Sequence, residues 1–179
     1  MIVRDYVDAV VGLQYGDEGK GKITASIVEQ MDYQYTVRYN GGPNAGHSIH
    51  KQNGAHYALH QLPSSIPYQK MGYIAPGALL DLEKLMQEIS DFILVEGFDP
   101  LEYLYIHPGV PLITPEHKSL DKKYHYKTQG STASGIAPAY ADYYNRTGKT
   151  FTFSKKDLQT YPELEKRLYD VDTLLLEGA

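Results

Sequence analysis

The alternation of hydrophobic and polar positions predicts strands and helices that follow one another along the chain. Val7–Leu13 is a short apolar run with β-branched residues, and it ends in a glycine-rich turn. After this turn, residues 22–31 space four apolar side chains at helical intervals: Ile23, Ile27, Val28 and Met31. Residues 80–93 place a longer apolar stripe on one helical face, made of Leu82, Leu85, Met86, Ile89 and Ile93. These patterns predict a strand, a loop and a helix near the N-terminus, and a second helix at residues 80–93.

Other stretches have the composition of strands. Residues 35–40, 56–63 and 104–113 predict strands, and residues 131–148 predict a loop that leads into a helical turn. Residues 172–179 contain a continuous apolar run, which is typical of a strand buried on both faces of a parallel sheet. The sequence therefore predicts an α/β fold with a mainly parallel sheet flanked by helices. Ligands in such sheets bind beyond the carboxyl ends of strands, so a sequence that stops at one predicts a truncated chain, a fragment or half of a split protein.

Composition narrows the classes of protein that remain. The 179 residues are 42% hydrophobic, which is enough for one domain with a core. The net charge of -5 gives no electrostatic footprint for nucleic acid, and the absence of cysteine excludes disulfides and thiolate metal sites. The N-terminus has neither a signal-peptide core nor a membrane-spanning run. We therefore expect a soluble, cytoplasmic protein that binds neither nucleic acid nor membrane.

A glycine-dense motif, GLQYGDEGKGKI, follows the first predicted strand at residues 12–23. The nearest general pattern is the phosphate-binding loop G-x-x-x-x-G-K-[ST]. The match is partial, because six residues separate Gly12 from Gly19 and because Lys20 is followed by Gly21 and not by a hydroxyl residue. Exposed N–H groups at a helix N-terminus beside a lysine still suit polyphosphate, which predicts P-loop-like nucleotide binding. The alternative is a solvated turn whose acids favour the helix dipole.

Asp17, in the same motif, needs its own explanation, because an acid beside phosphates must bind a metal or move a proton. A second glycine-dense turn, in RYNGGPNAGHSI, carries Asn40, Asn44 and His47 after the second predicted strand. Two such turns at neighbouring strand ends would face one crevice. A histidine there can act as a general acid, and backbone carbonyls can complete the shell of Mg²⁺. The alternative is that His47 is a hydrogen-bonded loop residue.

Five stretches in order resemble the successive motifs of adenylosuccinate synthetase: GLQYGDEGKGKI, VRYNGGPNAGHS, ALHQLPSSI, GSTASGIAPAYADYYNRTG and LLLEGA. They cover nearly the whole chain, and the first two are the most specific. The resemblance implies a ligase that joins IMP to L-aspartate with GTP and Mg²⁺, forming adenylosuccinate, GDP and phosphate. It also implies that residues 1–179 are the N-terminal part of a single adenylosuccinate synthetase-like domain, and that the enzyme is a homodimer.

The resemblance further implies a role for each motif residue. Asp17 would remove the N1 proton of IMP, so that the 6-oxygen attacks the γ-phosphate of GTP, and would also contact Mg²⁺. Lys20, with the backbone of Gly19 and Gly21, would neutralise charge on the transferring phosphoryl group. His47 would stabilise the developing 6-oxyanion.

Further residues would bind the metal and the nucleotide. The Gly46 carbonyl would bind Mg²⁺, while Ser131 and Thr132 would hold the 5′-phosphate of the nucleotide. Arg146 would reach the same phosphate across the dimer interface. The other implied nucleotide-binding positions are Gly16, Glu18, Lys22, Asn44, Ala45 and Ser48.

Several positions depart from the family's pattern. Tyr15 replaces a tryptophan, and Ala137 replaces a glycine, which is tolerable if that backbone keeps φ negative. Short motifs are also similar to an archaeal and phage branch, whose phage members act on dGMP. Those phage enzymes usually carry serine at the position of Asp17, so Asp17 favours IMP. The family's segments for aspartate and guanine lie beyond Ala179.

Four histidines offer a weaker metal hypothesis: His47, His50, His56 and His60. Residues 56–63 are predicted to form a strand, where positions i and i+4 lie too far apart to chelate zinc easily, so structural or surface histidines are favoured. Three hypotheses for function remain: a purine-nucleotide ligase, an inactive nucleotide-binding or interaction module, and a generic P-loop NTPase. The last is the weakest, because no Ser or Thr follows Lys20.

Overall fold

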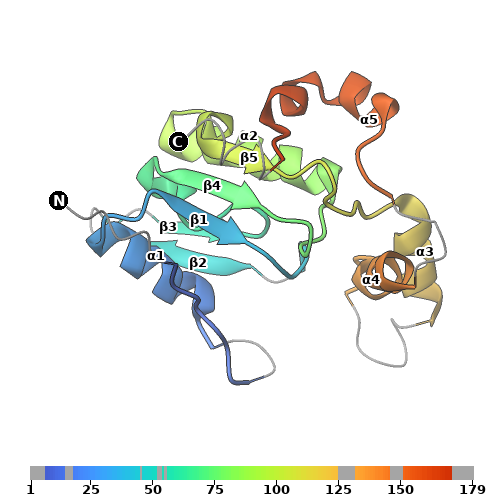
Figure 1. The fold of residues 1–179 in the computed structure, drawn as a ribbon, viewed down its shortest axis with the longest axis horizontal. Coiled ribbons are helices and arrows are strands. Elements are labelled where there is room, and N and C mark those ends of the chain that lie inside the picture. Colours follow the sequence, from blue (N-terminus) through green and yellow to red (C-terminus); the bar gives the residue numbers. More distant parts are fainter. Residues whose placement is uncertain are drawn as a thin grey trace.

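A three-stranded parallel sheet forms the centre of the fold (Figure 1). The computed structural model describes residues 7–14, 18–44, 46–51, 54, 56–124, 132–145 and 151–170. The strands follow the order β1 (Tyr35–Arg38), β4 (Met71–Ile74) and β5 (Leu104–Ile106). Their register places Arg38 beside Ile74, and Ile74 beside Ile106. The carboxyl ends of all three strands therefore meet at one edge of the sheet.

A separate antiparallel pair accompanies this sheet. It consists of β2 (His47–His50) and β3 (His56–Leu59), with His47 opposite Leu59. Helix α1 (Lys20–Gln30) lies against β2. The α/β architecture with a mainly parallel sheet and flanking helices, predicted from the sequence, is confirmed.

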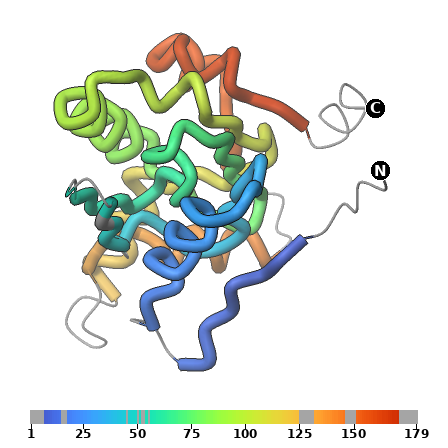
Figure 2. The backbone as a smooth tube through the Cα atoms, turned by 90° about the vertical axis from the view of Figure 1, so that its left-hand side faces the viewer, coloured from blue at the N-terminus to red at the C-terminus, as the bar shows by residue number. Residues whose placement is uncertain are grey.

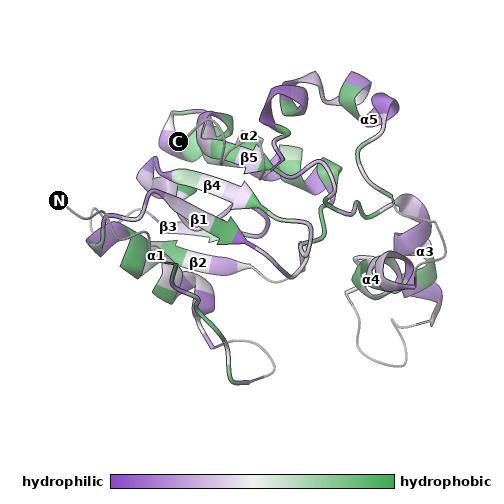
Figure 3. Ribbon diagram, in the orientation of Figure 1, coloured by the Kyte–Doolittle hydropathy of each residue, from purple (hydrophilic) through white to green (hydrophobic). Residues whose placement is uncertain are grey.

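Helix α2 (Leu82–Glu96) is the longest helix in the described residues, and local sequence explains both of its ends. The Asp81 side chain accepts the N–H of Lys84 at the start, and Gly97 ends the helix in the left-handed conformation, with φ 76°. The other helices are α3 (Pro115–Tyr124), α4 (Ile136–Tyr144) and α5 (Lys155–Thr160), and 3₁₀ segments span Ile66–Tyr68, Pro100–Tyr103 and Pro162–Arg167. Helices α3 and α4 pack on each other, and α3 is largely hydrophilic (Figure 3).

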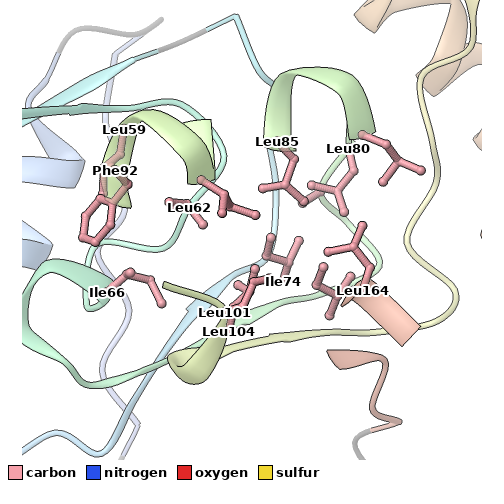
Figure 4. Packing of buried hydrophobic residues seen from close by; sticks show 14 of the residues in the cluster. Leu59, Leu62, Ile66, Ile74, Leu80, Leu85, Phe92, Leu101, Leu104 and Leu164 are labelled. Carbon is pink, nitrogen blue, oxygen red and sulfur yellow. The ribbon is translucent and has the colours of Figure 1, made fainter. Parts of the chain in front are cut away.

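The main core joins α2 to the strands (Figure 4). Leu85 and Phe92 of α2 cluster with Ile74 of β4 and Leu104 of β5. Leu164, from the 3₁₀ segment near the end of the described chain, is fully buried in the same cluster. The apolar stripe of residues 80–93 thus faces the core as predicted, with the exception of Ile93, which is 39% exposed.

Several predicted strands differ from the structure. Residues 7–14 form no strand, and Val7 and Leu13 are exposed. Figure 2 shows this segment, in dark blue, running outside the body of the fold. A strand needs a hydrogen-bonded neighbour, and among the described residues no strand pairs with this segment.

The predicted strand at residues 104–113 is shorter in the structure, because the chain turns after Ile106 through Pro108 and Gly109. The predicted helical turn within residues 131–148 is α4, whereas residues 172–179 lie outside the described part of the chain. None of the described helices is both long enough and apolar enough to cross a membrane.

We expect Leu85→Ala to lower the free energy of unfolding by about 2–5 kcal/mol, since truncating a buried leucine leaves a cavity. Leu85 is 0% exposed, whereas Leu94 of the same helix is 84% exposed. Leu94→Ala is the matched control and should change stability by less than about 0.5 kcal/mol. Urea denaturation followed by circular dichroism measures both, and equal losses would contradict this account of the core.

Candidate functional site

The first glycine-dense motif leads into α1. Gly19 precedes the helix in the left-handed conformation, with φ 78°, and Lys20 is its first residue. Lys20 Nζ forms an ion pair with Glu18 Oε2, and Glu18 Oε1 accepts the N–H of Gln14 at 2.9 Å. The hydrogen bond from Lys20 is the largest cause that lowers the pKa of Glu18, to about 2. Among the described residues, no side chain caps this helix start and its first turn contains no acid, which leaves a positive helix end for an anion.

Gly21 brings this motif into contact with the second one. A Cβ at position 21 would lie 2.4 Å from Cγ and Cδ2 of His47, closer than a side chain tolerates. The His47 ring therefore occupies the space beside α1 that a serine or threonine at this position would fill. The structure brings the two glycine-dense motifs together at this contact, although the strand predicted before the first motif does not form.

His47 is largely buried at the start of β2. Burial is the largest cause that lowers the pKa of His47 from 6.5 to about 4, and the nearby Arg38 and His60 contribute to the same lowering. Its Nε2 lies 3.0 Å from Ser64 Oγ. His47 is therefore a neutral, hydrogen-bonded imidazole at neutral pH, and a neutral ring can donate one N–H to a ligand without bringing a charge of its own.

Arg38, at the carboxyl end of β1, holds the turn that precedes His47. Its guanidinium donates to the Gly42 carbonyl at 3.0 Å, and burial lowers its pKa. The opposite charge of Glu88, on α2, partly offsets this lowering. Arg38 is thus a half-buried cation that fixes the backbone of the second motif.

Glu88 fixes the segment that follows β3, which packs on the same turn. Its carboxylate accepts the N–H groups of His60, Gln61 and Leu62 at 2.8, 2.9 and 3.2 Å. Burial raises the pKa of Glu88, against the lowering effect of these donors. The His60 ring packs on Gly46, because a Cβ at Gly46 would lie 2.7 Å from His60 Cε1. The turn therefore rests on a backbone that α2 holds in place.

Helix α4, which is distant in sequence, contacts the second motif. A Cβ at Gly42 would lie 2.9 Å from Cδ1 of Ile136, the first residue of α4. The Tyr140 hydroxyl accepts the Gly41 N–H at 2.9 Å and donates to the Gly77 carbonyl at 3.0 Å. The structure thus places α4, which follows the fourth motif's hydroxyl residues, against the turn that carries His47.

The described site residues differ in their surroundings. Thr132 is exposed, and its hydroxyl lies 2.8 Å from Ser134 Oγ, while Ala137 lies inside α4 with a negative φ, as its place in the motif requires. The other exposed positions are Gly19, Lys20, Lys22, Asn44, Gly46 and Ser48. Asp17, Gly16, Ala45, Ser131 and Arg146 lie outside the described residues.

Some residues that build the site carried no prediction of their own. The second motif is held by Ser64 and Tyr140, and the segment after β3 that packs on it is held by Glu88; only long-range contacts reveal this. For Ser64 a signal was present, since it lies inside the motif ALHQLPSSI. In the described part of the chain, no three His, Asp or Glu residues gather as a metal site. A cavity of about 420 Å³ between β3 and α2 is lined by residues such as His60 and Glu88, and its lining includes neither Lys20 nor His47.

Comparison with known proteins points to one family. The family model described as adenylosuccinate synthetase matches residues 9–174. The adenylosuccinate synthetase of Thermosipho africanus is 38% identical over 180 residues, covering 94% of this chain and 44% of that protein. The Hydrogenobaculum enzyme of the same name is 40% identical over 161 residues, covering 89% and 37% respectively. The chain therefore spans less than half the length of these relatives.

Two solved structures resemble the fold. The fully ligated adenylosuccinate synthetase of Plasmodium falciparum has a TM-score of 0.75 at 27% identity, over 93% of this chain and 47% of that one. The succinoaminodeoxyadenylate synthetase of cyanophage S-2L, bound to dGMP and dATP, has a TM-score of 0.69 at 24% identity, over 90% of this chain and 44% of that one. The second likeness concerns the fold alone.

Gly21→Ala should lower the free energy of unfolding by about 1–3 kcal/mol, because the new methyl group collides with the His47 ring. Helix propensity alone would make this substitution stabilising, since Ala is favoured over Gly in a helix by about 1 kcal/mol. A loss of stability would therefore point to the collision with His47. In a His47→Ala background the same substitution should become neutral or stabilising. Equal destabilisation in both backgrounds, measured in a double-mutant cycle, would refute the contact.

The pH dependence of stability should reveal the lowered pKa of His47. Between pH 4 and 6.5 the unfolded state binds more protons at this residue than the folded state does, so stability rises with pH across this range. Relative to His47→Gln, the free energy of unfolding of the wild type should rise by about 2–3 kcal/mol over that window and stay level above it. Urea titrations in a pH series measure the difference, and a level difference from pH 4 to 8 would contradict the prediction.

Proposed function

Because the chain belongs to the adenylosuccinate synthetase family, we propose that it is the part of a purine-nucleotide ligase that activates IMP. The reaction joins IMP to L-aspartate, converts GTP to GDP and phosphate, and proceeds through a 6-phosphoryl intermediate. The observation that carries the proposal is the packing of His47 on Gly21, which joins the two most specific motifs beside the sheet. The chain spans less than half of its curated relatives, so we propose the complete reaction for a protein that contains the remaining portion as well.

Asp17 is the proposed base. It takes the N1 proton of IMP, so that the 6-oxygen becomes nucleophilic and attacks the γ-phosphate of GTP. His47 donates a hydrogen bond to the developing charge on the 6-oxygen. The lowered pKa of His47 supports this role, because a neutral ring keeps one N–H and is not already paired with an anion.

Lys20 and the start of α1 are proposed to hold the transferring phosphoryl group. The uncapped helix end and the exposed Lys20 side chain support this, since both attract an anion. Glu18 pairs with Lys20 in the structure, so a bound phosphate would share or replace that ion pair. Gly16, Gly19, Gly21 and Lys22 are proposed to complete this phosphate site.

Mg²⁺ fits the oxygen donors proposed for it, the Gly46 carbonyl and the Asp17 carboxylate, because it prefers hard oxygen ligands. Gly46 is exposed beside His47, which leaves its backbone accessible. When bound, the ion would supply positive charge to the phosphates. Asn44, Ala45 and Ser48 are proposed to line the nucleotide on the same turn.

The nucleotide 5′-phosphate is assigned to Ser131 and Thr132, with Arg146 contributed by the second subunit of a cytoplasmic homodimer. The contact of α4 with Gly41 and Gly42 supports this assignment, since it joins the fourth motif to the turn that carries His47. The alternative substrate is dGMP, and a further alternative is a chain that binds nucleotide without catalysis.

Asp17→Asn should reduce ligase activity by about 10²–10⁴-fold and leave nucleotide binding largely intact, because the amide keeps the shape but cannot accept the N1 proton. The assay follows adenylosuccinate formation from IMP, GTP and aspartate, in a preparation that contains the complementary portion of the enzyme. The matched control is Asp32→Asn, an exposed acid just after α1.

Parallel reactions with dGMP in place of IMP decide the substrate. GTP hydrolysis that depends on neither the purine nucleotide nor aspartate would overturn the proposed function. Parental activity in Asp17→Asn would remove the base from its role.

A further inference from the structure

Ser64 is a buried hydroxyl that none of the motif assignments uses. It is 8% exposed, and its Oγ lies 3.0 Å from Nε2 of His47. The two residues come from different elements, since His47 begins β2 and Ser64 lies between β3 and a 3₁₀ segment. A serine hydroxyl can form a hydrogen bond with an imidazole nitrogen, so it can hold Nε2 of the neutral ring in place.

Side-chain hydrogen bonds hold the backbone of the segment before Ser64. Glu88 receives three consecutive backbone N–H groups, from His60 to Leu62. The Gln61 side chain, which is 0% exposed, accepts the Asp81 N–H at 2.8 Å and donates to the Asp81 carbonyl at 3.1 Å. Helix α2 and its N-cap therefore fix the backbone that leads to Ser64.

The chain after Ser64 is fixed by the sheet. Ser65 Oγ donates to the Met71 carbonyl at 2.9 Å and contacts Thr36 Oγ. Thr36 belongs to β1 and Met71 to β4, so both neighbouring strands hold this residue. Ser64 thus lies between two anchored segments, which fix its backbone within hydrogen-bond reach of His47.

The ring of His47 is restrained on a second side. Its Cβ, Cγ and Cδ2 lie against the backbone of Gly21, at 2.4–2.5 Å from where a Cβ would be. That contact supports the ring but does not select the orientation of its two nitrogens. The hydrogen bond at Nε2 does, because it distinguishes this nitrogen from Nδ1.

We propose that Ser64 is the positioning residue for His47: its hydroxyl binds Nε2 and so orients the imidazole against the start of α1. This inference rests on the proposed function for its catalytic meaning, since the oriented ring is the one assigned to the 6-oxygen of the purine. The hydrogen-bonded segment from His60 to Ser65 then serves to position the Ser64 hydroxyl.

The first test uses NMR of the chain without any nucleotide, so it does not depend on the proposed reaction. In the wild type we expect the ¹⁵N signals of His47 to report one dominant tautomer with a hydrogen-bonded Nε2. Ser64→Ala should shift the Nε2 signal and let the second tautomer appear, whereas Ser64→Thr should keep the wild-type pattern. Ser90→Ala, an exposed serine on α2, is the matched control and should leave the pattern unchanged.

The second test measures kinetics in a preparation that contains the complementary portion of the enzyme. Loss of an orienting partner typically costs about 10–100-fold in activity, so Ser64→Ala should lower kcat by that factor with little change in KM for the purine nucleotide. Ser64→Thr should restore most of the rate. Thermal unfolding of each variant shows whether a lower rate merely reflects loss of fold.

The outcomes separate the two proposals. An unchanged His47 spectrum in Ser64→Ala, or an unchanged kcat, overturns the positioning role. A folded wild type that shows the single His47 tautomer but no ligase activity overturns the proposed function, while the contact between Ser64 and His47 stands.

Discussion

The candidate site depends on having glycine, which has no side chain, at positions 21 and 42. At Gly21 the His47 ring occupies the space of a Cβ, and at Gly42 the Ile136 side chain does. Each contact joins segments that are distant in sequence: α1 to β2, and α4 to the turn after β1. Protein interiors are close-packed and have no space for an added methyl group, so a larger residue at either glycine would push these segments apart. Because both glycines are small, three motifs gather beside the carboxyl edge of one sheet, where α/β folds bind ligands.

Two half-buried charged side chains, Arg38 and Glu88, hold this arrangement in place. Arg38, at the end of β1, donates to the turn. Glu88, on α2, accepts the backbone N–H groups of residues 60–62. Burial lowers the pKa of Arg38 and of His47 and raises that of Glu88, since in each case it disfavours the charged form. Arg38 and Glu88 hold polar backbone groups, whereas His47 is kept neutral. The surroundings that fix the turn therefore also set the protonation state of the residue that the turn presents.

The N-terminal segment lies outside the body of the fold, although β1 is an edge strand among the described residues. In the described residues β1 pairs with β4 on one side, and its Tyr35 and Val37 are about half exposed. Val7 and Leu13 have the composition of a strand but are almost fully exposed. An apolar strand is stabilised only when neighbours cover it, so local composition alone does not order this segment. The relatives that share the fold are more than twice as long as the matched region.

The sequence by itself determined the elements whose signals are local. The periodicity of residues 22–31 and 80–93 located α1 and α2, and the glycine-dense motifs predicted Lys20, Gly21 and His47 as residues of one site. It also determined the family, because the motifs occur in order. It did not predict β2, or that α3 pairs with α4, since those elements are defined by the partner that covers them and not by their own pattern. Tertiary structure alone decided that Ser64 meets His47 across 17 residues, and that burial makes this histidine neutral. A side chain's hydrogen-bond partner and its pKa depend on groups brought close by folding, and no local period encodes them.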